Sequence, residues 1–508
     1  MDFDPEAYFA PDRLDKREQL EEGGIDPYPH EFDRTVTLGE YVERFGDVTE
    51  IDSEEQFQLA GRITGNIRDL GSITFLDITD ESGTVQLFCS EDDMEDYALL
   101  DAVDRGDVVG ATGTPMRTQN GELSLFVSEL EMLSKALNHP PGYEGLNAEQ
   151  RLRNRAVAMW SDPLRSNLEY RFEMLRVIRE YLESQSFTEV QTPVLQNVSG
   201  GTSARPFSTT VNAKDSEMYL RIAKELYHKR LVVGGFERIF EIGKDFRNED
   251  IDTTHNPEFT MMELYQAYAD YEDIMDLTEN LLVHILDELH DGDYTVEYHS
   301  PRRDEHGDIL RDDDGTILTD PVDLDFTPPW PRLTVDDALR EYADIDPDQL
   351  DDDALRERAL DVGGEFPAGF TRGLAIMELF EALVEHQLEG PVFIIDHPEE
   401  TTPLSKDHRE KEGRIERFEL FIAGAELGNA YTELNDPIQQ GEHFAAQMAR
   451  REAGDDEAHQ MDEDFVEALS YGMPPTGGLG IGLDRLAMVL TDSQSIKDVL
   501  PFPMVATQ

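Results

Sequence analysis

Two strand-like runs, 236–246 and 259–268, flank a polar loop and predict an antiparallel β-hairpin. The loop carries four polar side chains within ten residues: Arg247, Glu249, His255 and Asn256. Because side chains alternate along a strand, one face of the second run carries an aromatic ring, a carboxylate and a phenol, from Phe259, Glu263 and Tyr265. Taken singly, each residue fits an ordinary hairpin with a solvated loop. Together they favour a nucleotide bound next to a second polar ligand.

A second polar group, on an apolar background, begins in the strand-like run 417–422 (RFELFI). Three carboxylates and one amide follow the spacing E-x6-E-x2-N-x3-E: Glu419, Glu426, Asn429 and Glu433. We expect the last three to lie in a turn and at the start of a helix. Carboxylates rarely enter apolar surroundings without a cation, and hard oxygen ligands suit Mg²⁺. The 110 acidic residues of the chain make acidic clusters common, but the apolar neighbours distinguish this one.

A glycine-rich segment near the end, 474–490 (PPTGGLGIGLDRLAMVL), predicts a strand and turn that run into a helix. Gly478, Gly480 and Gly482 allow a ligand to approach the backbone closely, and Arg485 lies at the start of the helix. The chain has neither a P-loop nor a GxGxxG motif after a strand.

Upstream of these motifs, the sequence pattern of residues 56–135 predicts a small β domain. Five strand candidates are separated by turn residues: 56–63, 73–78, 84–89, 108–114 and 122–128. We expect a helix over 90–103, after the third strand, and this order indicates an OB-fold, whose face commonly binds oligonucleotides. Phe75 is the candidate for base stacking and Gln86 for a base-edge contact, with Arg62 and Glu129 as further candidates. From periodicity alone, Phe75 fits the barrel core equally well.

The remaining segments supply the frame of a larger domain. An amphipathic helix over 168–184, whose predicted apolar stripe includes Phe172, leads into a strand closed by Pro193. A small-residue loop at 199–207 contains Gly200 and Gly201, and Glu225 follows at the entrance of a helix. Further helices are expected over 271–295 and within 331–390. An acidic insertion lies near 296–330. Its sequence predicts a hairpin with an Asp-Gly turn and does not match the template of a calcium-binding loop.

Composition bounds the class of protein. The chain has 508 residues, enough for two or three domains, and its single cysteine, Cys89, excludes an internal disulfide. We find no apolar run of membrane length and no signal-like start, so we expect a cytoplasmic protein. A net charge of −67 with 39% hydrophobic residues favours a halophilic origin, because about 1 M salt shortens the Debye length to ~3 Å. In such salt, phosphate attraction is weak for any protein, so this charge does not exclude an RNA partner.

The sequence of these motifs resembles that of the class II (subclass IIb) lysyl-tRNA synthetases. FRNE followed by HNPEFTMMELY is similar to motif 2, the helix–strand–proline unit to motif 1, and the glycine-rich segment to motif 3. GRI, FLDITDESGTVQLF and GELSLFVSELEMLSKAL are similar to the anticodon-binding domain of that subclass. The segment 11–22 followed by IDPYP resembles the entry segment of the family.

This resemblance implies an α+β fold: an antiparallel class II sheet with flanking helices, plus an N-terminal all-β OB-fold domain, assembled as a homodimer. The expected boundaries are 1–50 for a helical extension, 51–136 for the OB-fold, 137–165 for a linker and 166–508 for the catalytic domain. The implied reaction joins L-lysine and ATP into lysyl-adenylate and then transfers the lysyl group to tRNA(Lys).

The resemblance also assigns roles by position. Arg247 and Arg485 would be the catalytic arginines on the α- and γ-phosphates of ATP, with Arg485 also on the free face of an adenine stacked on Phe259. The other expected nucleotide contacts are Glu249, His255 and Asn256. Lysine would lie among Gly200, Gly201, Glu225, Glu263, Tyr265, Asn429 and Glu433. Mg²⁺ would bind Glu419 and Glu426, and the anticodon would contact Arg62, Phe75, Gln86 and Glu129.

Other functions are less well supported by the same residues. Aspartyl- or asparaginyl-tRNA synthetases need an arginine or amide where this chain has Glu263 and Glu433, which suit a cationic ligand. A paralogue that modifies a protein typically lacks the OB domain. A non-catalytic RNA-binding accessory protein on the same fold would have lost an arginine of motif 2 or 3 or the metal acids, and this chain has them all. The departures from the family are the acidic insertion and the C-terminal PFPMVATQ.

Overall fold

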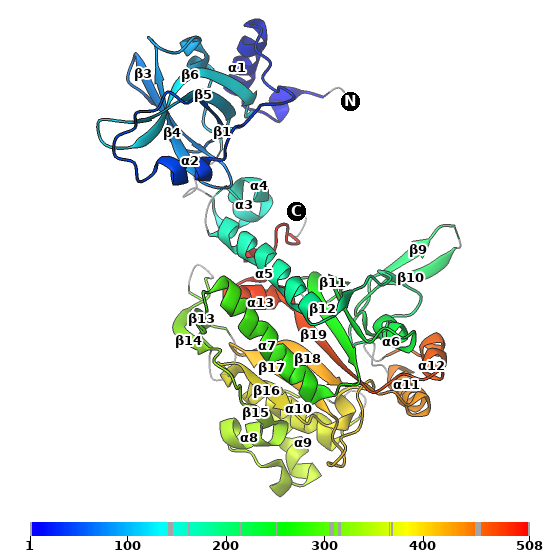
Figure 1. Ribbon diagram of the computed structural model, residues 1–508. Coiled ribbons are helices and arrows are strands. Elements are labelled where there is room, and N and C mark those ends of the chain that lie inside the picture. The colour runs from blue at the N-terminus through cyan, green and yellow to red at the C-terminus, as the bar shows by residue number, and fades with distance from the viewer. Residues whose placement is uncertain are drawn as a thin grey trace. The chain divides into compact units, whose positions relative to one another are not determined.

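The structure is a computed structural model that divides into two compact units, Met1–Ala148 and Glu149–Gln508. Each unit is described by itself (Figure 1). Apart from the side chains of Ala148 and Glu452, the described residues are 3–140, 146–160, 163–213, 215–249, 251–303, 309–312, 316–364, 366, 369–452 and 459–505.

The first unit is a closed β-barrel. Its strands are β1 (Phe57–Ile63), β2 (Arg68–Asp69), β3 (Ile73–Thr79), β4 (Thr84–Ser90), β5 (Val108–Arg117) and β6 (Leu123–Ser134). They run in the order β1-β5-β6-β4-β3-β2, and an additional β1–β3 pairing closes the barrel. The strand order and the closure confirm the predicted OB-fold.

The barrel core includes residues from the N-terminal helices. Leu20 of α1 (Pro11–Glu22) and Tyr41 of α2 (Leu38–Phe45) are buried with the strand side chains. A capping box at Thr37 begins α2, because its hydroxyl accepts from the Glu40 backbone N–H while the Glu40 carboxylate accepts from the Thr37 N–H.

The prediction of a helix over 90–103 is wrong. Only a short 3₁₀ helix, η2 (Tyr97–Asp101), forms there. Asp92, Asp93 and Asp96 are weak helix formers, and the apolar side chains between β4 and β5 are buried against the barrel at irregular spacing. The Ser90–Asp93 contact exists, but as a side-chain hydrogen bond of 2.8 Å.

The second unit is built on one mixed sheet with the order β15-β16-β17-β18-β19-β12-β11-β7. All neighbouring pairs are antiparallel except β15–β16 and β7–β11 at the two ends. The strands are β7 (Thr188–Glu189), β11 (Arg238–Phe246), β12 (Glu258–Ala267), β15 (Arg332–Thr334), β16 (Val392–Ile395), β17 (Arg417–Ile422), β18 (Ala425–Thr432) and β19 (Thr476–Gly482). The predicted class II architecture is confirmed.

Helices and short strands surround this sheet. The helices are α3 (Ala148–Arg153), α4 (Arg155–Ala158), α5 (Leu164–Ser184), α6 (Glu225–Val233), α7 (Tyr271–Leu289), α8 (Val335–Ala343), α9 (Asp352–Asp361), α10 (Arg372–Leu383), α11 (Pro437–Glu452), α12 (Glu463–Leu469) and α13 (Leu483–Leu490). The smaller strands are β8 (Leu195–Gln196), β9 (Ser208–Val211), β10 (Ser216–Leu220), β13 (Thr295–Pro301) and β14 (Thr319–Asp325).

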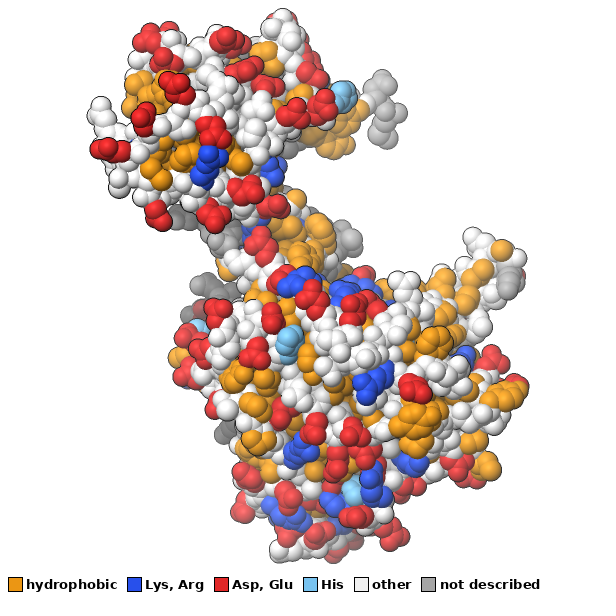
Figure 2. Space-filling view, viewed as in Figure 1, with side chains coloured by type: hydrophobic (Ala, Val, Ile, Leu, Met, Phe, Trp, Pro, Cys, Tyr) orange, Lys and Arg blue, Asp and Glu red, His pale blue; other side chains and the backbone are white. Residues whose placement is uncertain are grey.

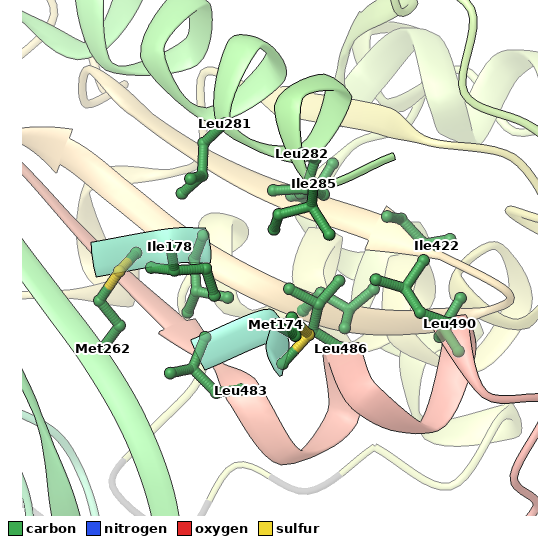
Figure 3. Close-up of a cluster of buried hydrophobic side chains, with 14 of the residues drawn as sticks. Met174, Ile178, Met262, Leu281, Leu282, Ile285, Ile422, Leu483, Leu486 and Leu490 are labelled. Atoms are coloured by element: carbon green, nitrogen blue, oxygen red, sulfur yellow. The ribbon is translucent and has the colours of Figure 1, made fainter. Parts of the chain in front are cut away.

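The sheet separates a packed core from the face that carries the site. Figure 3 shows side chains of α5, α7 and α13 meeting sheet residues such as Met262 and Ile422. Along β12, Met262 and Leu264 enter this core, while Glu263 and Tyr265 face the other side, as the period-two pattern predicts.

Two further predictions concern helix α5 and the acidic insertion. Phe172 does not join the apolar stripe of α5, because its side chain is 52% exposed while Met174 and Ile178 are buried. The expected hairpin within the insertion has its Asp-Gly turn outside the described residues. The described part pairs β13 with β14 and continues in the bridges Arg303–Ile309 and Arg311–Ile317.

The surface carries the negative charge of the sequence. In Figure 2, acidic side chains are spread over both units, whereas Lys and Arg side chains occur in small groups. Within the described residues, no helix is both long enough and apolar enough to cross a membrane.

Candidate active site

A cleft of about 720 Å³ lies over the centre of the sheet in the second unit. Its wall contains every residue predicted to bind ATP, lysine or metal except Gly200. Gly200 is buried beside the cleft, where an added Cβ would lie 2.9 Å from Leu226. The cleft therefore brings together residues from the 199–207 loop, α6, β12, β17, β18 and β19, which are far apart in the sequence.

Glycines of β19 form the floor of the cleft. Gly478 pairs with Tyr265 on one side and Tyr431 on the other, and Gly480 pairs with Glu263 and Asn429. A Cβ at Gly478 would lie 1.9 Å from Oε1 of Glu433. The absence of a Cβ at Gly478 lets the side chains of Glu433 and Tyr265 lie against the strand, while close approach of a ligand to this backbone stays a prediction.

The segment expected as a turn and helix start, 426–433, instead belongs to strand β18 as far as Thr432. Pairing with β17 and β19 satisfies its backbone, and its residues Gly428, Asn429, Tyr431 and Thr432 do not favour a helix. Alternation places Asn429 and Tyr431 toward the cleft, and Glu433 follows in the same phase just beyond the strand. A bulge opposite Leu420 and Phe421 changes the phase, so Glu426 also faces the cleft.

Arginine and aromatic side chains form one part of the wall. The guanidinium of Arg247 lies 5.1 Å from the centre of the Phe259 ring, and its Nε is buried without a hydrogen-bond partner. Arg485, in the first turn of α13, donates to the Glu426 carbonyl at 2.9 Å and lies 2.8 Å from Nε2 of His255. This part of the cleft suits a planar ring next to anionic oxygens.

The loop at 199–207 is tied to the segment that follows β11. The Arg205 backbone N–H donates to Glu249 at 3.2 Å, and the Asn248 N–H donates to the Arg205 carbonyl at 2.8 Å. Gly201 has φ +97°, a conformation that favours glycine, and lies against Ala223. The side chain of Asn256 donates to the Glu258 carbonyl at 2.5 Å and accepts from the Met504 N–H at 3.3 Å.

Three buried carboxylates form another part of the wall: Glu225, Glu263 and Glu433. The Lys224 backbone N–H holds Glu263 Oε1 at 2.8 Å, and the Tyr265 hydroxyl donates to Glu263 Oε2 at 3.2 Å. Burial and the neighbouring Glu263 raise the pKa of Tyr265 well above its ordinary value, so its hydroxyl stays protonated. A ligand with positive charge complements this surface.

Glu419 and Glu426 meet at the amide of Asn429, whose Nδ2 lies 3.3 Å and 3.4 Å from their Oε1 atoms. Burial opposes ionisation of Glu419, but Arg417 and His397 lower its pKa to about 2. Burial and Glu419 raise the pKa of Glu426. Among the described residues, no three acidic, His or Cys side chains form a metal site by themselves. Two carboxylates that also rely on substrate oxygens are a suitable set for Mg²⁺.

The sequence did not point to several residues at this site. Arg417, Tyr431 and His459 line the cleft, and Lys229 lies buried behind it. The Tyr431 hydroxyl donates to Glu225 Oε2 at 2.6 Å. If residues 425–432 had been predicted as a strand, Tyr431 would have been predicted to face the cleft, since it lies two residues from Asn429.

In the first unit, the candidate nucleic-acid residues lie on the outside of the barrel. Phe75 is half-buried between the buried Thr74 and Leu76, so it is not a core residue. Its ring meets Phe88, which stacks on Phe126, and sequence reasoning missed these two rings. Among the other candidates, Gln86 accepts from Ser124 at 3.0 Å, Arg62 donates to the Gly106 carbonyl at 2.7 Å, and Glu129 is exposed.

Comparison with known protein families agrees with both units. Residues 147–506 match the family of class II tRNA synthetases for D, K and N, and residues 57–133 match the OB-fold nucleic acid binding domain. The chain belongs to this class II tRNA synthetase family.

Within that family, the chain is similar to several lysine–tRNA ligases. The chain is 44% identical to the lysine–tRNA ligase of Saccharolobus solfataricus, 46% to that of Moorella thermoacetica and 43% to that of Bacillus subtilis. Each alignment covers 97% of this chain and 96% of the relative. The similarity therefore extends through both units.

Proposed function

We infer that this chain is a lysine–tRNA ligase. It activates L-lysine with ATP to lysyl-adenylate and then transfers the lysyl group to the 3′ end of tRNA(Lys). One observation carries the inference: a single cleft joins the Phe259–Arg247–Arg485 group to three buried carboxylates. The near full-length similarity to lysine–tRNA ligases supports it.

The first step requires positioning rather than a protein nucleophile. A carboxylate oxygen of lysine attacks the α-phosphorus of ATP, the new O–P bond forms, and the bond to the bridging oxygen breaks to release pyrophosphate. Arg247 binds the α-phosphate and Arg485 the γ-phosphate, while adenine stacks on Phe259. Glu249, His255 and Asn256 hold the nucleotide. These groups align the reactants and stabilise charge as it develops on oxygen.

The choice of amino acid follows from charge. Glu225 and Gly201 take the α-ammonium end of lysine, and Glu263 and Glu433 take the ε-ammonium group. Asn429 and Tyr265 complete the contacts. Aspartate or asparagine would leave the negative charge of Glu263 and Glu433 only partly compensated, by the ion pair of Glu433 with Lys229, and this is unfavourable in a buried site. We therefore favour lysine over the amino acids of the sister enzymes.

Glu419 and Glu426 are the residues that would hold Mg²⁺ next to the nucleotide. Bound there, the ion would neutralise phosphate charge. Asn429 keeps the two carboxylates together by donating to both. Arg417, which lines the cleft, and the buried His397 hold Glu419 in its ionised form.

We propose that the OB-fold unit binds the anticodon through Phe75, with Gln86, Arg62 and Glu129 around it. Further proposals are a homodimer, a cytoplasmic location with the rest of the translation machinery, and a halophilic origin. The acidic surface of both units supports the last of these (Figure 2), since concentrated salt screens its self-repulsion.

Lysine-dependent exchange of pyrophosphate into ATP, measured in molar KCl, tests this function. We expect exchange with lysine and little with aspartate or asparagine. Exchange driven by aspartate or asparagine instead of lysine would contradict the charge argument. Binding of tRNA without any exchange would favour an accessory RNA-binding protein.

A further inference from the structure

Lys229 lies behind the wall of the cleft, on helix α6, with its side chain fully buried. Its Nζ is 2.6 Å from Glu225 Oε1 and forms a second ion pair with Glu433. The same ammonium donates to the Leu404 carbonyl at 3.3 Å and lies 5.6 Å from the centre of the Tyr431 ring. One buried cation thus joins two of the three carboxylates that face the cleft.

This arrangement sets the charge of the predicted lysine subsite within the cleft. Glu225, Glu263 and Glu433 supply three negative charges when ionised, and Lys229 supplies one positive charge. The remainder of two negative charges equals the number of ammonium groups on lysine. Without Lys229, the same subsite would set three carboxylates against only two ammonium groups of the ligand.

We propose that Lys229 is a positioning residue that fixes the charge and spacing of the lysine subsite. It holds the carboxylates of Glu225 and Glu433 on one buried cation, so that one remains available for the α-ammonium and the other for the ε-ammonium group of the substrate. The proposal rests on the proposed function. Lys229 acts through the two carboxylates, because both line the cleft and it does not.

Electrostatics explains why a cation is needed. Two buried carboxylates without a cation between them cannot both stay ionised, and one takes up a proton. Burial raises the pKa of Glu433 well above its ordinary value, and Lys229 opposes part of that rise. The titratable groups that interact with Glu433 come from α6, β12 and β18: Glu225, Lys229, Glu263, Tyr265 and Tyr431. His228 of α6 faces Glu263 at 3.8 Å, and His459, in the segment after α11, interacts with Lys229.

His459 does not replace Lys229 as a cation. In the unaltered chain, burial and Lys229 lower the pKa of His459 to about 4. Burial is the larger cause and remains in Lys229→Met, so this imidazole stays neutral near pH 7. The Lys229→Met variant should therefore gain a proton on the carboxylate pair, mainly on Glu433. That proton must leave before both ammonium groups of lysine can be bound.

Calorimetric titration of the full chain with lysine in molar KCl provides the test. The proton count comes from the heats in two buffers of different ionisation enthalpy. At pH 7 we expect Lys229→Met to bind lysine at least about tenfold more weakly than the unaltered chain. It should also release up to one more proton per lysine, and its Kd should fall as the pH rises, by up to about tenfold per unit.

Two further variants separate charge from structure. Lys229→Arg keeps the cation and should show no extra proton release. The double variant Lys229→Met/Glu225→Gln removes one charge of each sign, so the extra proton release should also vanish. If Lys229→Met alone does not fold, the double variant supplies the test. The proposal would then be overturned if the double variant released more protons per lysine than Glu225→Gln does.

Lys411→Met is the matched control, since Lys411 is an exposed lysine outside the cleft. It should bind lysine normally. Lysine binding by Lys229→Met with unchanged Kd and proton count would overturn the proposal, as would an equal loss of affinity at every pH. Failure of the unaltered chain to bind lysine would instead overturn the proposed function.

Discussion

Arg171 and Asp484 form a buried ion pair that joins helix α5 to the first turn of α13. Arg171 Nη2 lies 2.7 Å from Asp484 Oδ1 and also donates to the Thr260 hydroxyl at 2.9 Å. The second oxygen of Asp484 accepts from the Thr260 backbone N–H at 2.7 Å. The pair therefore fixes β12 and α13 to each other next to Arg485, which follows Asp484 directly.

Breaking this pair should reduce both stability and nucleotide binding. We expect Arg171→Met or Asp484→Asn to cost about 3–5 kcal/mol of unfolding free energy, because each leaves one buried charge alone. The KM for ATP should rise, since the first turn of α13 carries Arg485. Urea unfolding and exchange kinetics measure the two effects. Arg176→Met on the exposed side of the same helix is the control. Equal stability losses in both arginine variants would refute this interpretation.

Replacing Gly478 by alanine should weaken lysine binding selectively. The added Cβ would lie 1.9 Å from Glu433 Oε1 and 2.6 Å from the Tyr265 ring, so both side chains must move. Overpacking of this kind costs about 1–3 kcal/mol, or roughly 5- to 150-fold in the KM for lysine at about 1.4 kcal/mol per tenfold. Gly390→Ala, where an added Cβ meets nothing within 4 Å, should keep the original KM.

The Tyr431 hydroxyl should contribute to lysine binding through Glu225. Tyr431→Phe removes its 2.6 Å hydrogen bond to that carboxylate. Hydrogen bonds to charged groups are worth about 1.5–3 kcal/mol, so we expect the KM for lysine to rise about tenfold or more while the KM for ATP changes little. Tyr471→Phe changes a 76% exposed tyrosine and serves as the control. A parallel rise in both KM values would argue against a role specific to lysine.

The sequence predicted the parts of the site that depend on local pattern. The hairpin of β11 and β12 follows from period-two alternation, which placed Glu263 and Tyr265 on one face. The strand, turn and helix around Arg485 follow from glycine spacing. Both patterns are set by a few consecutive residues, so no distant contact was needed to infer them.

What the sequence did not reveal depends on contacts across the fold. The segment 426–432 contains a glycine and an asparagine, which are typical of turns, and it belongs to a strand because β17 and β19 pair with it. Lys229 would be expected at the surface, as lysines usually are, and its burial follows from Glu225 and Glu433. Register and burial of this kind arise from pairing partners far away in the chain.

Glu241 should contribute acid-sensitive stability. Burial opposes its ionisation, yet His228, Thr192 and Arg221 lower its pKa to about 2, below the unfolded value of 4.5. Its stabilising effect is therefore complete above pH 4.5 and is lost as the pH falls toward 2. The difference in unfolding free energy between the unaltered chain and Glu241→Gln should shrink by up to about 1.4 kcal/mol per pH unit in that range. A difference that stays constant from pH 5 to pH 3 would contradict the expected pKa.

Phe75 should affect tRNA binding without affecting lysine activation. Its ring lies on the outer face of the barrel with Arg68 5.6 Å from its centre, in a position to stack on a base. Removing such a stack costs about 1–3 kcal/mol, so Phe75→Ala should weaken tRNA(Lys) binding roughly 5- to 150-fold in filter-binding assays. Pyrophosphate exchange should stay unchanged, because the cleft lies in the other unit. Phe3→Ala removes an aromatic ring that is 64% exposed in the same unit and should leave tRNA affinity intact. Equal losses in the two variants would show that a general change in the surface of the unit, rather than stacking on Phe75, determines tRNA affinity.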